Sequence, residues 1–147
     1  MKIAGYALIS LIALGLVVLS TAPLAEGHHS FASEFDAEKP IALGGFVTKV
    51  EWMNPHVWFY LDVTDAATGE VENWGFEMGA PHQLQRRGWS RSIISLGDEL
   101  LVEGSMSRDG SSRVNARSVA TADGRVLGAA SSGAQTLGGG NATEPQN

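Results

Sequence analysis

The sequence predicts an all-β fold with one short helix, and three observations support this prediction. Between positions 57 and 63, apolar residues alternate strictly with other residues, as in a strand with one buried face. Four further segments after Pro40 also have strand-like composition and are bounded by turn residues. Only residues 80–88 combine helix-forming side chains with Pro81 at the start and Gly88 at the end.

The first predicted strand is long and bent. Its apolar residues alternate on one face up to Leu43 and on the other face from Phe46 onward. Gly44 and Gly45 stand at this change, and a glycine pair that switches the buried face is typical of a β-bulge. Pro55 interrupts the pattern, so the strand is expected to end before it.

The next two strands form a predicted hairpin. The strictly alternating segment is followed by residues 65–69, which have the composition of a hairpin loop. The partner strand then runs from about 71 to 78, with Trp74, Phe76 and Met78 on one face.

After the helix, two more strands are predicted, at about residues 99–103 and 113–120. Three strands, a short helix and two strands is the order of an OB-fold, a five-stranded, partly open barrel. A long first strand bent at glycine fits the way such barrels turn corners. We therefore predict a small five-stranded OB-like barrel over residues 28–127, with a small sandwich of the same strands as the alternative.

Residues 1–27 have the pattern of a cleaved secretory signal peptide. Lys2 precedes an uncharged apolar stretch, and residues 25–27 (Ala-Glu-Gly) place small side chains where a signal peptidase needs them. A retained membrane anchor is the alternative, because the apolar stretch approaches the length that spans a bilayer. We expect cleavage before His28, which makes the protein periplasmic or secreted and leaves no stable membrane anchor.

Composition narrows the class of partner. Cleavage leaves 120 of the 147 residues, enough for one domain, with the net charge still −6. Such an acidic chain is not attracted to nucleic acid or anionic lipid. The absence of cysteine excludes disulfides and thiolate ligands. Residues 128–147 are rich in glycine, alanine, serine and asparagine and are predicted to form a disordered tail.

The four histidines are the candidate metal ligands. After cleavage, His28 would offer both an amine and an imidazole, with His29 beside it. His56 and His82 lie at strand ends, and the predicted hairpin would bring His56 near Glu77 and Met78, with His82 a further candidate. Imidazole suits copper and zinc, and copper heads the affinity order for nitrogen sites, so the cofactor is left open with copper as the metal to test first. The alternative is that these histidines are ordinary surface residues.

Two groups of aromatic and basic residues are candidate binding surfaces. Trp58 and Tyr60 alternate with the apolar residues of the second strand, so they form either a stacking platform for a ligand or part of the core. Trp89 is surrounded by three arginines that could receive an anionic partner or lie over the indole. These are Arg86, Arg87 and Arg91.

Catalytic motifs are not evident. The sequence contains no Gly-x-Ser-x-Gly elbow in a strand-turn-helix context, no His-Glu-x-x-His zinc motif and no phosphate-binding glycine pattern. Whether the protein is an enzyme is therefore left open, and a non-enzymatic role is favoured.

Several short motifs together resemble a known family. They are His28-His29-Ser30-Phe31, Glu34-Phe35-Asp36, residues 45–52 (Gly-Phe-Val-Thr-Lys-Val-Glu-Trp), Asn54-Pro55-His56, Trp74-Gly75-Phe76-Glu77-Met78-Gly79, Arg86-Arg87-Gly88-Trp89 and Leu96-Gly97-Asp98-Glu99. Over about residues 27–127 the chain is similar to a family of uncharacterised secreted bacterial proteins, a domain of unknown function. The resemblance implies an OB-like barrel and an exported protein, and it supplies no reaction, ligand or catalytic residue.

The sequence favours an exported binding module that binds a metal such as copper through its histidines. One alternative is a binder of carbohydrate or peptide, or of a partner protein, that uses the aromatic face or the arginine surface. Another is an oxidoreductase or hydrolase with a histidine-bound metal.

Overall fold

The computed structural model describes residues 31–132. In chain order the elements are α2 (Phe31–Glu34), β1 (Phe35–Glu51), β2 (Trp58–Thr64), β3 (Val71–Glu77), α3 (Pro81–Arg86), β4 (Glu99–Ser107), β5 (Arg113–Thr121) and β6 (Val126–Gly128). The predicted all-β class with little helix is confirmed. The predicted signal segment, His28 and His29 lie outside the described residues. Within residues 31–132, no helix has the length and apolar character needed to cross a membrane.

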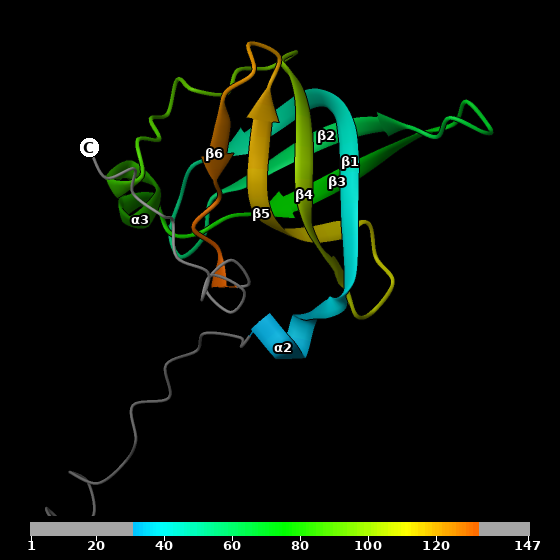
Figure 1. The fold of residues 1–147 in the computed structure, drawn as a ribbon, viewed down its shortest axis with the longest axis horizontal. Helices are drawn as coiled ribbons and strands as arrows, with labels where there is room; N and C mark the ends of the chain where they lie inside the picture. The colour runs from blue at the N-terminus through cyan, green and yellow to red at the C-terminus, as the bar shows by residue number, and fades with distance from the viewer. Residues whose placement is uncertain (1–30, 133–147) are drawn as a thin grey trace, which may run out of the picture.

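The strands form one sheet that curls into a ring (Figure 1). Their order is β3-β2-β1-β4-β5-β6, and a parallel pairing of β3 with β5 closes the circuit of the five longer strands. The predicted sequence of three strands, a helix and two strands is confirmed, but the described residues contain a sixth strand. β6 is only three residues long and follows a tight turn at Gly124, so it has too few positions to show an alternating pattern.

The bend in β1 differs from the prediction. The strand begins at Phe35, before Pro40, and its register with β4 is uninterrupted from Pro40 to Phe46, so there is no bulge at the glycine pair. The register with β2 shifts between Val47 and Lys49 instead. Gly45 is needed for close approach, because a Cβ there would lie 2.3 Å from the carbonyl oxygen of Asp62.

The core fills the interior of the ring. Val57, Phe59, Leu61 and Val63 are buried, as the strict alternation predicted, and Phe59 stacks on Phe76 of β3 with ring centroids 5.1 Å apart. Burial of each such side chain contributes about 1.5–3 kcal/mol. Because apolar side chains occupy the interior, the candidate binding residues lie at its rim and on its outer face.

Packing against the sheet continues past residue 127, where the sequence predicts the end of the domain. Ala129, Ala130 and Ser131 are buried, and the backbone N–H of Gly79 donates to the carbonyl oxygen of Ala129 at 2.8 Å. The sequence did not reveal this packing because small residues also suit a solvated tail. The rest of the predicted tail, from residue 133, lies outside the described residues.

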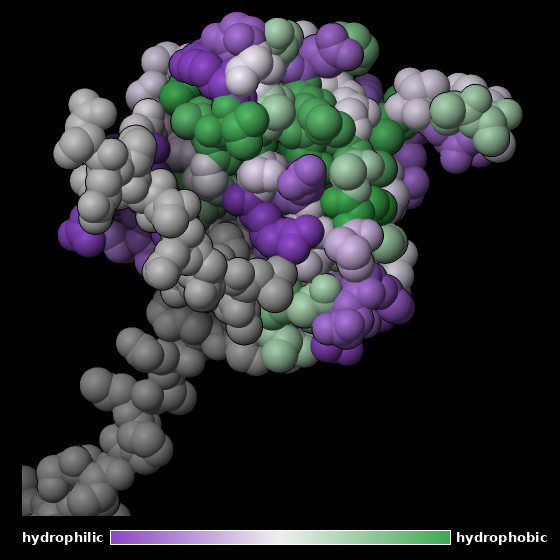
Figure 2. All heavy atoms as spheres, in the orientation of Figure 1, coloured by the Kyte–Doolittle hydropathy of each residue, from purple (hydrophilic) through white to green (hydrophobic). Residues whose placement is uncertain are grey.

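Part of the outer surface is apolar. Figure 2 shows hydrophobic side chains gathered over the β4–β6 side of the ring. Leu101 and Val126 both flank Ala120 in the sheet register and are exposed. This row is distinct from the polar and aromatic face of the β2–β3 hairpin described below.

Candidate functional site

The first candidate site is the histidine–glutamate pair, formed by His56 and Glu77. His56 immediately precedes Val57, whose N–H donates to the carbonyl oxygen of Gly79 at 3.1 Å and whose carbonyl oxygen accepts from the N–H of Met78 at 2.8 Å. These hydrogen bonds hold the start of β2 beside the end of β3. The expected proximity of His56 to Glu77 is therefore confirmed.

A short contact joins the two side chains. His56 Nδ1 lies 2.7 Å from Glu77 Oε1, and the side chains are 29% and 9% exposed, respectively. Asn115 of β5 donates from Nδ2 to the same oxygen at 3.2 Å. With its Nδ1–H directed at the carboxylate, a neutral His56 keeps the lone pair on Nε2, the nitrogen that can bind a metal.

The environment of Glu77 combines burial with opposing charges. Burial raises the pKa of Glu77, His56 opposes that rise, and the nearby Glu34 carboxylate adds to it. Asn115 favours the ionised form by donating to it. Glu77 is thus a buried carboxylate held in place by partners from two other parts of the chain.

The other predicted metal ligands are not gathered at this pair. His82 lies in the first turn of α3 and is exposed, whereas Met78 is fully buried in the core. Within the part of the chain that the structure describes, no three histidine, aspartate or glutamate side chains are grouped closely enough to hold a metal ion. The histidine–glutamate pair therefore supplies one imidazole and one carboxylate, and His28 and His29 lie outside the described residues.

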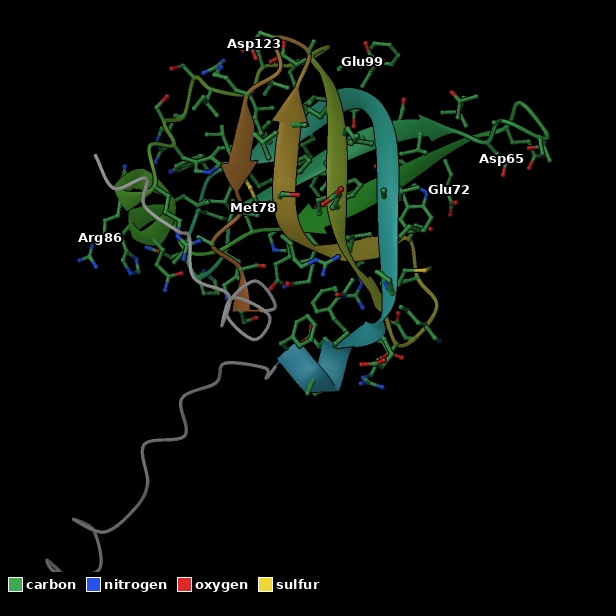
Figure 3. The ribbon with its side chains drawn as sticks, viewed as in Figure 1. Asp65, Glu72, Met78, Arg86, Glu99 and Asp123 are labelled. Atoms are coloured by element: carbon green, nitrogen blue, oxygen red, sulfur yellow. The ribbon has the colours of Figure 1, made fainter. Side chains whose placement is uncertain are left out.

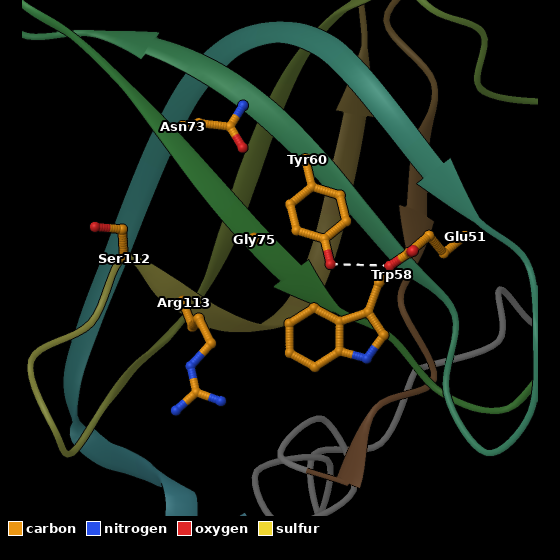
Figure 4. Close-up of a pocket in the computed structure, with 7 residues that line it drawn as sticks. All are labelled: Glu51, Trp58, Tyr60, Asn73, Gly75, Ser112 and Arg113. Carbon is orange, nitrogen blue, oxygen red and sulfur yellow. Dashed lines mark hydrogen bonds between the residues drawn. The ribbon is translucent and has the colours of Figure 1, made fainter.

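A second candidate site is a groove on the outer face of the β2–β3 hairpin (Figure 4). Trp58 and Tyr60 project from the face opposite to buried Phe59. They therefore lie on the outer face of the sheet and do not fill the core. Gly75 pairs with Tyr60, and a Cβ there would lie 3.2 Å from Tyr60 Cε1 and 3.6 Å from Trp58 Cζ3. The missing side chain lets both rings lie against β3. We call this surface the aromatic groove.

Polar groups fix the rings of the aromatic groove. The Tyr60 hydroxyl donates to Glu51 Oε2 at 2.9 Å, and Lys49 Nζ lies 2.6 Å from Glu51 Oε1 and 5.1 Å from the centroid of the Tyr60 ring. At the other side, Arg113 Nη2 lies 2.8 Å from Asp109 Oδ2. The groove has a volume of about 380 Å³, within the range of about 300–1,000 Å³ typical of ligand sites.

The same contacts set the protonation of the groove. Burial raises the pKa of Tyr60, and its hydrogen bond to Glu51 raises the pKa further. Hydrogen bonds from Lys49 and Tyr60 lower the pKa of Glu51. Near neutral pH the phenol is therefore a donor and the carboxylate an acceptor.

A family model covers most of this fold, matching residues 15–116 as a family of unknown function, DUF6152. The chain belongs to this family. The expected membership of an uncharacterised family is thereby confirmed, although the match begins earlier and ends earlier than the predicted resemblance. No curated protein matches the chain, and no solved structure does.

The arginine surface proposed from the sequence is altered by the burial of its tryptophan. Trp89 is 3% exposed, and its Nε1–H donates to the carbonyl oxygen of Gly128 at 3.0 Å, so in this member of DUF6152 it is a core residue. Arg86, Arg87 and Arg91 are exposed, and Figure 3 shows Arg86 on the outer side of α3. The arginines alone remain available to a partner.

Several site residues were not found from the sequence. Asn115 reaches Glu77 only because β5 pairs with β3 in parallel, with Glu77 and Asn115 as direct partners. Arg113 reaches the groove through the same pairing, opposite Gly75. Glu51 could have been placed near Trp58 from the sequence, because it lies just before the Asn54-Pro55 break and therefore opposite Trp58 in the hairpin of β1 and β2.

Proposed function

We propose that this protein is an exported, non-enzymatic module that binds a metal ion through His56, with copper as the preferred metal. The observation that carries the proposal is the 2.7 Å contact between His56 Nδ1 and Glu77 Oε1. Metal-binding histidines commonly donate their second ring N–H to a carboxylate, which fixes the tautomer and the ring orientation and makes the other nitrogen a better ligand. Glu77 is positioned to do this, and it is buried where its position is fixed.

The N-terminal histidines supply the remaining ligands in this proposal. His29 precedes Glu34 by five residues, so the chain allows it to lie within about 18 Å of Glu34, whose charge acts on Glu77. Removal of residues 1–27 would add the free amine of His28. The export that this requires is supported by the signal-like pattern of residues 1–27.

Copper is favoured by the chemistry of this ligand set. Imidazole and amine nitrogens bind Cu(II) more tightly than the other divalent ions of the first transition row. The chain contains no cysteine, so thiolate sites that would favour other metals cannot form. One Cu(II) per chain, held by His56 together with His28 or His29, is the expected stoichiometry.

The test is a competitive Cu(II) titration of the protein that begins at His28. His56→Ala should abolish the tight site, and Glu77→Gln should weaken it by about 10- to 100-fold because the ring loses its orienting carboxylate. His82→Ala is the matched control, since this exposed histidine lies outside the pair, and it should bind as the wild type does. Wild-type affinity in His56→Ala would refute the proposal.

A further inference from the structure

We propose that the aromatic groove binds a neutral oligosaccharide built of pyranose rings with equatorial substituents. This site is separate from the proposed metal ligands and does not depend on metal. The groove is defined by Trp58, Tyr60 and Gly75, with polar side chains from β1, β3 and β5 around it.

The two aromatic rings provide the stacking surface. Trp58 and Tyr60 lie two residues apart on one strand, so their Cα atoms are about 7 Å apart and their side chains follow each other along the groove. Figure 4 shows the two rings one after the other, with Gly75 of β3 beside them. Pyranose rings with equatorial substituents expose flat faces of C–H groups, which pack on aromatic faces. Two consecutive platforms suit an oligomer better than a single sugar.

The rim supplies hydrogen-bonding groups of several kinds. The amide protons of Asn73 and the hydroxyl proton of Ser112 are already donated to other side chains, so these two residues offer acceptor oxygens, and Arg113 brings guanidinium donors. Figure 4 shows Asn73 beyond Tyr60, and Ser112 and Arg113 on the side of the groove opposite Glu51. Sugar hydroxyls both donate and accept, so a rim that mixes donors and acceptors matches them. OB-like barrels commonly bind oligosaccharides on the face that includes the second and third strands.

Charge pairing favours a neutral ligand. Lys49 is paired with Glu51, and Arg113 with Asp109, so each cation bordering the groove already has a carboxylate partner. Single-stranded nucleic acid also stacks on aromatic rings, but its binding requires a positively charged groove. The net charge of −6 opposes it further.

Lys49 lies over the Tyr60 ring but is not among the residues that line the groove. Its ammonium lies 5.1 Å from the Tyr60 centroid, and its side chain is 58% exposed. No such cation is placed over Trp58 among the described residues. Trp58 is therefore the principal platform, and Tyr60, held by Glu51, extends it.

The test is isothermal titration of the metal-free protein with cellohexaose, in the presence of EDTA. Saturable binding should fall at least about 10-fold in Trp58→Ala and be largely kept in Trp58→Phe, which retains an aromatic ring. Trp74→Phe is the control, because Trp74 lies on the opposite face of the hairpin, and it should bind as the wild type does. Thermal melts show whether each variant is folded.

Two outcomes would overturn the proposal. One is equal cellohexaose binding by the wild type and a folded Trp58→Ala variant. The other is no binding of cellohexaose by the folded wild type, including the case in which a single-stranded oligonucleotide binds in the groove instead. Because EDTA is present throughout, neither outcome bears on copper binding at His56.

Discussion

Trp58 and Glu77 are direct partners in the antiparallel ladder of β2 and β3, so their side chains project from the same face of the sheet. The next pair along this face is Tyr60 and Gly75. The histidine–glutamate pair thus lies at one end of the aromatic groove. The carboxylate that contacts the proposed metal ligand His56 lies beside the groove because Glu77 and Trp58 share one ladder position.

The interior face of β2 should dominate the stability of the domain. Leu61 is fully buried, so Leu61→Ala should lower the free energy of unfolding by about 2–5 kcal/mol through lost burial and the cavity that remains. Thr64→Ala, at the exposed end of the same strand, should change it by less than about 0.5 kcal/mol. Urea denaturation measures both. A small effect at Leu61 would contradict the assignment of this face to the core.

The packing of the C-terminal segment on Gly79 should stabilise the fold. A Cβ at Gly79 would lie 2.2 Å from the carbonyl oxygen of Ala130, so Gly79→Ala should destabilise the domain by about 1–3 kcal/mol or more. Gly69→Ala is the comparison variant: its Cβ would meet no atom within 4 Å, so any loss of stability there comes only from backbone strain at a φ of 77°. Thermal melts of Gly79→Ala at wild-type stability would show that this packing is absent.

Truncation tests the same segment independently. A chain that ends at Leu127 loses the Gly79–Ala129 and Trp89–Gly128 hydrogen bonds and the buried Ala129 and Ala130. A chain that ends at Ser132 keeps all of these contacts. The first should melt at a clearly lower temperature than the second. Equal melting temperatures would show that residues 128–132 do not stabilise the domain, so that it ends at residue 127 as the sequence predicts.

The protonation of Tyr60 should report the polar contacts of the groove. Burial and the Glu51 carboxylate both raise its pKa above 10.0. In the protein that begins at His28, Tyr60 is the only tyrosine, so tyrosinate absorbance against pH measures it directly. Glu51→Gln should lower the pKa of Tyr60, because the substitution removes the negative charge that opposes ionisation of the phenol. This contribution to stability is complete below pH 10 and is lost as pH rises through the raised pKa. An unchanged midpoint in Glu51→Gln would contradict the hydrogen bond.

The limits of the sequence prediction follow from the range of the contacts involved. The burial of the side chains from Val57 to Val63 could be predicted because strict alternation within one strand is enough to assign each of them to the inner or outer face. The burial of Trp89 depends instead on Gly128, 39 residues later. The position of Asn115 depends on the closure of the ring by β3 and β5. The sequence indicated a bulge at Gly45. The actual reason for glycine there is close approach to Asp62, which lies on another strand and could not be identified as a neighbour from the sequence.

Copper binding by His56 is tested most directly by electron paramagnetic resonance of the protein that begins at His28, loaded with one equivalent of Cu(II). If His56 binds through Nε2, the wild-type spectrum should contain a nitrogen coupling that is missing in His56→Ala and retained in His82→Ala. Glu77→Gln should keep this coupling and show weaker Cu(II) retention against a competing chelator. Identical nitrogen couplings in the wild type and His56→Ala would contradict the assignment of His56 as a copper ligand.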